Sequence, residues 1–434
     1  MQVFLYFRVG ACGMTEEFLY HIWQFKKWDF TVPLRTLCGK SVEVISPGMR
    51  NKQSGPDFSH AKLRIDGVLW AGNVEFHVLT SDWYLHQHDG DKNYENLILH
   101  IVYQHNTDAV PEGFPTLELA DAVPERLLME YKNLQKTYDF VACERYFSEV
   151  DEFLTDQCAV SWGIARLEKK VQEQQRKLEH LCGNWEALLF VSLAEAFGAP
   201  YNKIPFALLA SSFDYAVLRK LVHKPGEVEA LLFGQAGFLK ETQDEVQREM
   251  RNKYLYTAHK HGLTPIDLHT FKFAGMRPPN FPTVRLAQLA ALYAGSKDIF
   301  RYLVVENDWE PMWQLLKNVE VSAYWDNRFT LKKTSTAVMP KAFSDSFIRH
   351  IIINAVVPLK YFYYAIFYAH QENPALAILE NLEAEKNQIL TKFVKIGAKI
   401  ENALQAQGYI ALYNEHCTQK KCLECKIGNK VLNL

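Results

Sequence analysis

The sequence lacks an excess of charge of either sign. Its 48 Lys and Arg residues nearly balance its 50 Asp and Glu residues, which leaves a formal net charge of −2. A protein without a net basic field does not recruit nucleic acid over its whole surface, so any contact with DNA or RNA has to depend on a local basic groove. This balance counts against a strongly basic nucleic-acid-binding protein.

The chain also lacks an evident targeting or membrane-spanning segment. Residues 1–13 have no basic start and Arg8 interrupts their apolar part, so we interpret them as an extension before Met14 rather than as a signal peptide. The apolar stretch 347–368 contains Arg349 among several polar interruptions, which favours a buried helix over a lipid-spanning one. We therefore expect a cytoplasmic protein with no membrane partner.

Internal repeats and a phosphate-binding loop are missing as well. The segment 234–237 is glycine-containing but too short to frame a phosphate, and we expect it to be a turn between helices. A chain of 434 residues is too long for one ordinary core. After Cys143 the apolar residues recur at helical spacing. The sequence therefore predicts an α+β protein, with a mixed-sheet domain over 14–140 and a mainly α-helical domain over 150–434 that includes the C-terminal tail.

Two carboxylates and an imidazole are predicted to meet beside a β-hairpin. From Ala61 the residues alternate between apolar and polar until an Asp-Gly turn signal, and a second strand follows. Because side chains alternate along a strand, Glu75 and His77 share one face, while Asp57 enters at the start of the neighbouring strand. Carboxylates are the ligands that Mg²⁺ and Mn²⁺ prefer, although a solvated turn beside a polar strand face explains the same residues without a metal.

The segments Pro56-Asp57 and Glu75-Phe76-His77 resemble the PD-(D/E)XK nuclease core. The resemblance implies that Asp57 and Glu75 hold Mg²⁺ or Mn²⁺, that the carbonyl of Phe76 adds a ligand, and that the protein cleaves DNA or RNA. His77 occupies the position of the family's lysine and would orient or deprotonate the attacking water. A histidine is mostly neutral at pH 7, so it cannot act as the permanent cation that lysine provides.

The segment after the hairpin is rich in imidazoles and aromatic rings. Of its two histidines, His88 is the stronger catalytic candidate, and His86 is more simply explained as a hydrogen-bonded loop residue. Trp83 and Tyr84 are candidates for substrate contact. His100 lies in the apolar run 97–103, which predicts a buried strand and a satisfied core histidine. In the resembled nuclease core, the connection between two such strands contains a helix beside the active site.

Nearly the whole chain also resembles a more specific family, the bacterial domain of unknown function family 2851. This resemblance implies no particular activity, because the family has no settled one. The resemblance is carried by the segments 14–19, 54–58, 70–77, 81–84, 232–237 and 277–282.

Arg277 and Arg285 flank a proline-framed entry to a predicted helix. Arginines beside a helix N-terminus can bind phosphate, and both are candidate substrate contacts. The alternative, which we favour, is that they form structural pairs with carboxylates at a domain junction.

Three cysteines, Cys417, Cys422 and Cys425, stand close together in the tail. Their spacing suits a metal site, zinc or iron–sulfur, with the fourth ligand left open between His416, Cys143 and Cys158. Some nucleases of the resembled core hold an iron–sulfur cluster with a similar layout. The alternative is three reduced, unligated thiols near the chain end.

Two competing functions remain open beside a nuclease. One is a non-catalytic module that keeps the nuclease fold and binds nucleic acid or protein through its aromatics and arginines. The other is a histidine-rich, transition-metal hydrolase of a small phosphoester. The sequence distinguishes neither DNA from RNA nor endonuclease from exonuclease action, and it leaves the oligomeric state open.

Overall fold

The protein is described here by a computed structural model that covers residues 13–51, 54–86, 88, 91–136, 140–295 and 298–432. The extension predicted before Met14 therefore lies almost wholly outside the described residues. The chain forms two compact units: unit 1 comprises Met1–Thr155 and Tyr413–Leu434, and unit 2 comprises Asp156–Leu412. This division differs from the sequence prediction, because the C-terminal tail packs with the N-terminal unit and not with the helices that precede it.

A six-stranded mixed sheet forms the centre of unit 1. Its order is β1-β3-β4-β5-β6, with β2 paired to β3. The hairpin β3–β4 is antiparallel and turns at Asp66-Gly67, where both residues have positive φ as an Asp-Gly hairpin turn requires, whereas β4, β5 and β6 run parallel. The strands are β1 (Val42–Ser46), β2 (Met49–Arg50), β3 (Phe58–Ile65), β4 (Val68–Leu79), β5 (Leu97–Gln104) and β6 (Thr116–Glu118).

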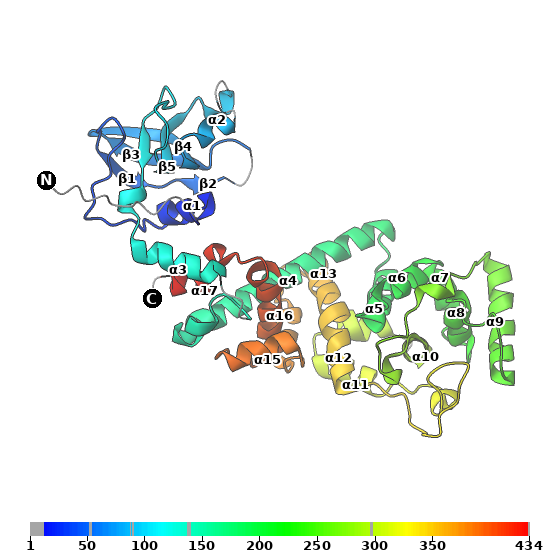
Figure 1. Ribbon diagram of the computed structural model, residues 1–434. Helices are drawn as coiled ribbons and strands as arrows, with labels where there is room; N and C mark the ends of the chain where they lie inside the picture. The colour runs from blue at the N-terminus through cyan, green and yellow to red at the C-terminus, as the bar shows by residue number, and fades with distance from the viewer. Residues whose placement is uncertain are drawn as a thin grey trace. The chain divides into compact units, whose positions relative to one another are not determined.

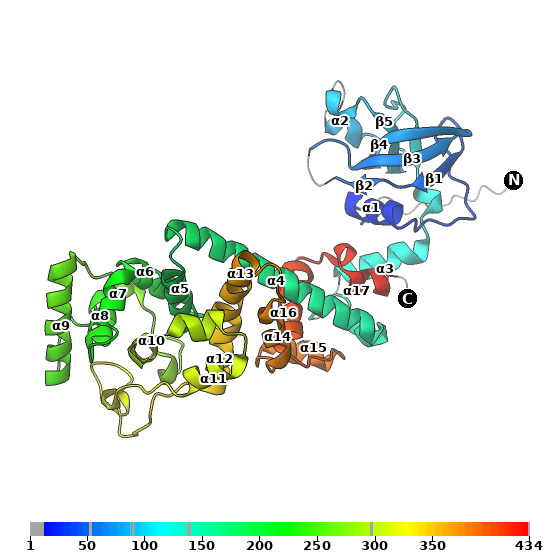
Figure 2. The ribbon, with the colours of Figure 1, turned by 180° about the vertical axis from the view of Figure 1, so that it is seen from behind.

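Two helices lie on opposite sides of this sheet (Figures 1 and 2). On one side is α1 (Glu16–Gln24), capped by the Thr15 side chain, and on the other is the short helix α2 (Asp82–Leu85). The β4 residue Phe76 packs against Trp23 of α1 with 5.8 Å between ring centroids. Its neighbour His77 faces Trp83 of α2 at 6.1 Å, because consecutive strand residues point to opposite faces.

The C-terminal segment returns to unit 1 and lies beside α3 (Glu125–Lys136) in both views (Figures 1 and 2). It consists of η9 (Tyr413–Cys417), η10 (Cys422–Glu424) and α17 (Lys426–Val431). Lys420 donates a hydrogen bond to the backbone carbonyl of Gln135 in α3. In turn, Tyr131 of α3 stacks on Phe18 of α1 with centroids 4.1 Å apart. The two ends of the chain are thereby joined through α3.

Unit 2 is helical, as predicted, and its core is a large cluster of buried apolar side chains. Close helix contacts depend on glycine: a Cβ at Gly408 of α16 would lie 1.8 Å from the carbonyl oxygen of Ala159 in α4. Its helices are α4 (Glu152–His180, which begins in unit 1), α5 (Trp185–Gly198), α6 (Lys203–Ser211), α7 (Tyr215–Leu221), α8 (Glu227–Gln235), α9 (Glu245–His261), α10 (Pro282–Gly295), α11 (Trp309–Lys317), α12 (Asp345–Ile351), α13 (Val357–Phe367), α14 (Pro374–Asn381), α15 (Gln388–Lys395) and α16 (Ala403–Leu412).

The apolar stretch noted in the sequence is one continuous helical element, Asp345–Phe367. Within the described residues it is the single helix long and apolar enough to cross a membrane by length and composition, and 61% of its most apolar window is buried inside the protein. A π-helical turn, η8 (Ile352–Val356), widens the helix just before Pro358, which cannot donate a backbone hydrogen bond. Lys360 is fully buried and donates to the backbone carbonyls of Val304 and Glu306.

Candidate functional site

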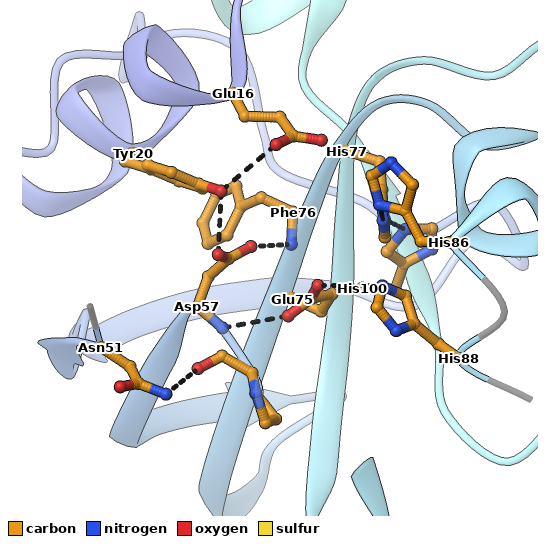
Figure 3. Close-up of polar contacts among 11 residues, drawn as sticks. Glu16, Tyr20, Asn51, Asp57, Glu75, Phe76, His77, His86, His88 and His100 are labelled. Atoms are coloured by element: carbon orange, nitrogen blue, oxygen red, sulfur yellow. Dashed lines mark hydrogen bonds and ion pairs between the residues drawn. The ribbon is translucent and has the colours of Figure 1, made fainter. Parts of the chain in front are cut away.

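Asp57 and Glu75 lie side by side on neighbouring strands, as the sequence predicts. Phe58 pairs with Val74 across the hairpin, and this register places Asp57 beside Glu75 and Phe76. The backbone amide of Asp57 donates to Glu75 Oε2 at 2.9 Å, and the amide of Phe76 donates to Asp57 Oδ2 at 3.0 Å. Each carboxylate is thus fixed by a backbone amide of the other strand, which orients both toward a common region (Figure 3).

A third carboxyl group reaches this region from α1. Tyr20 donates to Asp57 Oδ1 at 2.8 Å, and its hydroxyl lies 3.5 Å from Glu16 Oε2 one helical turn earlier. Figure 3 shows Glu16 reaching over Tyr20 toward Asp57, with four imidazoles gathered beside Glu75. Glu17, by contrast, is largely exposed and pairs with Arg50 at 2.5 Å. Of the two acidic residues in the first turn, Glu16 is the one that belongs to the site.

The carboxyl groups are in an environment that disfavours their charge. Burial raises the pKa of Glu75 to about 9, with the nearby charge of Asp57 adding to the shift. Burial also raises the pKa of Asp57, although hydrogen bonds from Tyr20 and from the Phe76 amide oppose it. The pKa of Glu16 is raised by burial and then by Asp57. The pKa values of all three acidic groups are raised, so a cation bound beside them would stabilise their ionised forms.

Four polar residues form a line of contacts that runs from His86 across strands β4, β5 and β6. Thr116 Oγ1 lies 3.4 Å from His100 Nδ1, His100 Nε2 lies 2.9 Å from His77 Nδ1, and His77 Nε2 lies 3.0 Å from His86 Nδ1. His77 and His100 are fully buried, whereas His86 is exposed. Burial lowers the pKa of His77 to about 2 and that of His100 to about 3, so both are neutral imidazoles. The line therefore leads from the buried sheet to solvent.

His88 connects this imidazole line to the carboxylates. Its Nε2 lies 3.5 Å from Glu75 Oε1, and its ring packs 4.4 Å from that of Tyr94. One ring nitrogen from each of His77, His86 and His88 lies within 4.8 Å of the others, a spacing that can hold a metal ion. The predicted catalytic residues Asp57, Glu75, His77 and His88 thus lie together.

The carboxylates of Asp57 and Glu75 can each accept bonds beyond the hydrogen bonds that fix them. Each carboxylate oxygen has two lone pairs, so the hydrogen bonds to Asp57 and Glu75 orient these groups and still leave acceptor capacity. Carboxylate oxygens suit Mg²⁺ and Mn²⁺, and the adjoining imidazoles extend the range to softer transition metals.

The aromatic candidates have separate positions. Trp83 is only 2% exposed and packs on His77, His100 and Phe114, so it contributes to the core, and its predicted contact with substrate stays a prediction. Tyr84 is 39% exposed and stays available for contact. The sequence of the polar segment after the hairpin did not show which of these two aromatic side chains faces inward.

The arginine candidates belong to unit 2. Arg277 is exposed. Arg285 donates to Gln288 Oε1 at 2.8 Å and to Asn280 Oδ1 at 2.7 Å, and its guanidinium lies 3.4 Å from the centre of the Phe347 ring. These contacts, with two side-chain amides and an aromatic ring, fit a structural role, and the substrate contact of Arg285 stays a prediction.

Sequence reasoning missed Glu16, Tyr20 and the line through His86. An acidic residue in the first turn of a helix is already explained by the helix dipole, so its presence there does not by itself indicate a functional site. The usable signal was spacing, because Glu16, Tyr20 and Trp23 share one face of α1 at i, i+4 and i+7. The cysteines Cys417, Cys422 and Cys425 lie in the C-terminal segment of the same unit as free thiols.

Fold and site together define an α+β protein in which a mixed sheet carries a carboxylate and histidine centre and a helical unit follows. The chain belongs to the family described as protein of unknown function (DUF2851), whose family model matches residues 16–388. This match confirms the family expected from the sequence and includes every residue of the carboxylate and histidine centre. No curated protein and no solved structure matches the chain.

Proposed function

We propose that unit 1 hydrolyses phosphodiester bonds of DNA or RNA with a divalent metal ion held by Asp57 and Glu75. The observation that carries the proposal is the reciprocal fixing of these two carboxylates by backbone amides at 2.9 Å and 3.0 Å. The sheet supports the resemblance to the PD-(D/E)XK core, since the parallel strands β4 and β5 are connected through helix α2 beside the site.

The metal would be Mg²⁺ or Mn²⁺, with the Phe76 carbonyl as a further ligand beside Asp57. Such an ion lowers the pKa of bound water and stabilises charge on the phosphoryl oxygens. Asp57 and Glu75 hold their geometry through the backbone amides that donate to them, and the hydrogen bond from Tyr20 lowers the pKa of Asp57 against the effect of burial.

The imidazole line supplies a route for the proton of the attacking water. If each imidazole donates inward, from His86 through His77 and His100 to Thr116, then His86 Nε2 presents a lone pair outward. His86 rather than the buried His77 then accepts the proton and releases it to solvent, because burial keeps His77 and His100 neutral. In this relay from the attacking water to solvent, His77 in the lysine position orients His86 through the hydrogen bond to its Nδ1.

A non-catalytic binding module is the second candidate, and one observation favours it. His77 is fully buried and both of its ring nitrogens face other imidazoles, so the position of the family's lysine supplies no cation.

A third candidate is a transition-metal hydrolase of a small phosphoester. The grouping of His77, His86 and His88 favours it over a Mg²⁺ enzyme.

The test is degradation of mixed DNA and RNA by the full chain with Mg²⁺ or Mn²⁺, compared with a Glu75→Ala variant. We expect cleavage by the wild type and loss of at least about 100-fold in the variant, because a metal ligand acts in the transition state. The matched control is Glu17→Ala, which removes an exposed carboxylate from α1 and should leave activity within about twofold.

Three results would redirect the proposal. Retention of nucleic acid without cleavage identifies the binding module. Cleavage of a small phosphodiester with Zn²⁺ or Mn²⁺, and none of polynucleotide, identifies the transition-metal hydrolase. Equal cleavage by the wild type and by folded Glu75→Ala would show that a contaminant or another site is responsible.

A further inference from the structure

Three imidazoles from one short stretch of chain converge beside the carboxylate of Glu75 (Figure 3). His77 lies on β4, His86 directly follows α2, and His88 lies two residues further along the chain. Their ring centroids are 4.9, 5.4 and 5.6 Å apart, and no two of the rings are parallel. One ring nitrogen of each lies within 4.8 Å of the others. These three residues, the histidine triad, thus surround a common point instead of forming a stack.

His77 is the fixed member of the histidine triad. Its ring is fully buried, its Nδ1 lies 2.9 Å from His100 Nε2, and the ring of Trp83 packs against it at 6.1 Å. A histidine that binds a metal almost always has its second ring nitrogen fixed by an outer hydrogen-bond partner, and His100 is in the position of that partner. If His77 Nδ1 donates to His100, then His77 Nε2 presents its lone pair toward His86 Nδ1.

The histidine triad has an aromatic wall and an exposed entrance. The rings of Trp83 and Tyr94 lie 5.2 and 4.4 Å from the ring of His88, which is half-buried. His86, by contrast, is exposed. An ion can therefore reach the triad from the side of His86, while the aromatic rings limit the access of solvent from the side of His88.

The donor atoms of the triad suit Zn²⁺ better than Mg²⁺. His77 Nε2 and His86 Nδ1 are 3.0 Å apart. Two nitrogens bound to a tetrahedral zinc ion at about 2.0 to 2.1 Å are separated by roughly 3.3 Å. Glu75 Oε1, at 3.5 Å from His88 Nε2, offers a fourth ligand or a compensating charge. Because Mg²⁺ prefers oxygen ligands, the two carboxylates remain its better site.

We propose that His77, His86 and His88 form a second cation site, for Zn²⁺ or an ion of similar chemistry, and that its occupation removes the proton acceptor of the imidazole line. In the metal-free protein, one proton lies between His86 Nδ1 and His77 Nε2, and a bound ion takes its place. His86 stays neutral by losing the proton of Nδ1 to solvent and taking one up from solvent at Nε2.

This change of tautomer occupies the nitrogen on which the proton relay depends. Once Nε2 of His86 carries a hydrogen, it has no lone pair to accept the proton of the attacking water. An ion in the triad should therefore inhibit the reaction that Mg²⁺ or Mn²⁺ supports at Asp57 and Glu75. The inhibition rests on the proposed function, whereas the cation site does not.

Zinc binding to the full chain tests the site. His86 is exposed, so His86→Ala leaves the core intact. We expect the wild type to bind one more equivalent of Zn²⁺ than this variant. The affinity for that ion should fall by more than the roughly 10- to 100-fold cost of losing an outer hydrogen-bond partner. The matched control is His60→Ala, which removes an exposed imidazole of β3 in the same unit and should keep the ion.

X-ray absorption at the zinc edge identifies the ligands of the additional ion. We expect nitrogen and oxygen neighbours with the signature of imidazole. Equal zinc binding by the wild type and His86→Ala, or a first shell of sulfur alone, would overturn the site.

Nitrogen NMR of the imidazoles tests the loss of the proton acceptor without an activity assay. On zinc binding, His86 Nδ1 should change from a protonated to a metal-bound nitrogen, and His86 Nε2 should become the protonated one. His77 should bind through Nε2 and keep its proton on Nδ1. A His86 Nε2 that stays unprotonated in the zinc-bound protein would refute the loss of the acceptor, whether or not the protein is a nuclease.

Cleavage with Mg²⁺ in the presence of zinc tests the inhibition. At a free Zn²⁺ concentration about ten times the Kd of the triad, roughly one chain in eleven keeps an empty triad, so the rate should fall about tenfold. The inhibition should persist as Mg²⁺ is raised. Relief by Mg²⁺ would place the inhibitory zinc at Asp57 and Glu75, and activation by zinc would identify the transition-metal hydrolase; either result overturns the inhibitory role of the triad. A chain that cleaves nothing with any metal refutes the proposed hydrolysis, while zinc binding and NMR still decide the site.

Discussion

Replacing Glu75 with glutamine separates the effect of its charge from the effect of its shape. The amide oxygen of glutamine still accepts from the backbone amide of Asp57, which now lies 2.9 Å from Glu75 Oε2. What disappears is the ionisable group, whose pKa is about 9 in the fold because of burial and Asp57, against about 4.3 in an unfolded chain. Between these two values the folded protein binds a proton that the unfolded chain releases.

The stability of the metal-free protein should therefore fall as the pH rises from about 4.5 to 9. At pH 7, about 2.7 units above the unfolded pKa, ionisation of this carboxyl stabilises the unfolded chain by at most about 4 kcal/mol relative to the protonated folded form. We expect metal-free Glu75→Gln to be more stable than the wild type at pH 7 by about 1 to 3 kcal/mol, and nearly equal to it at pH 4.

Added metal should reverse this order. A ligand at 100 times its Kd stabilises the folded protein by about 2.7 kcal/mol, and the glutamine variant lacks the charged ligand that this gain requires. Calorimetric unfolding at pH 4, 7 and 9, each with EDTA and with Mn²⁺, measures both effects. The control is Glu17→Gln, whose exposed pair with Arg50 should change stability by less than about 1 kcal/mol at any pH. If Glu75→Gln is less stable than the wild type at pH 9 in EDTA, the reasoning fails.

Three further predictions follow from contacts in both units. Tyr20→Phe keeps the ring packing on Phe76 but removes the donor to Asp57, so the pH at which Mn²⁺ binding is half-maximal should rise by about one unit, and a fall would contradict the assigned hydrogen bond. His86→Ala should lower kcat for nucleic-acid cleavage by about 100-fold with KM little changed, and added imidazole should restore part of the rate; an unchanged kcat would remove His86 from the relay. Gly408→Ala should cost unit 2 about 1 to 3 kcal/mol in denaturant unfolding, because the new Cβ meets the Ala159 carbonyl, whereas Gly295→Ala has open space and should be neutral or stabilising.

The parts of the fold that follow from local signals were predictable. The Asp66-Gly67 turn sets the hairpin register, the Thr15 side chain caps α1, and the apolar run at 97–103 becomes the buried strand β5. The convergence of Asp57 and Glu75 follows from the same hairpin, because register and alternation together fix which side chains meet.

The parts that depend on distant contacts could not be found in this way. The imidazole line requires the parallel register of β4 on β5, which no turn specifies, since the two strands are joined by a long connection. The burial of Trp83 and the exposure of His86 were likewise invisible in a segment of mixed polar and aromatic residues. The C-terminal cysteines belong to unit 1 only because the tail returns to it, and the tail's composition gives no indication of this.

The discontinuity of unit 1 has a consequence for its biosynthesis. Residues 413–432 leave the ribosome only after the whole of unit 2, roughly 250 residues later, which at 5–20 residues per second takes roughly 10 to 50 s. During this interval the sheet and α3 are exposed without their last covering segment, and a nascent chain stalled before Tyr413 carries that surface uncovered. Chaperone binding and aggregation of translation intermediates should therefore concentrate on the first 155 residues rather than on the helical unit.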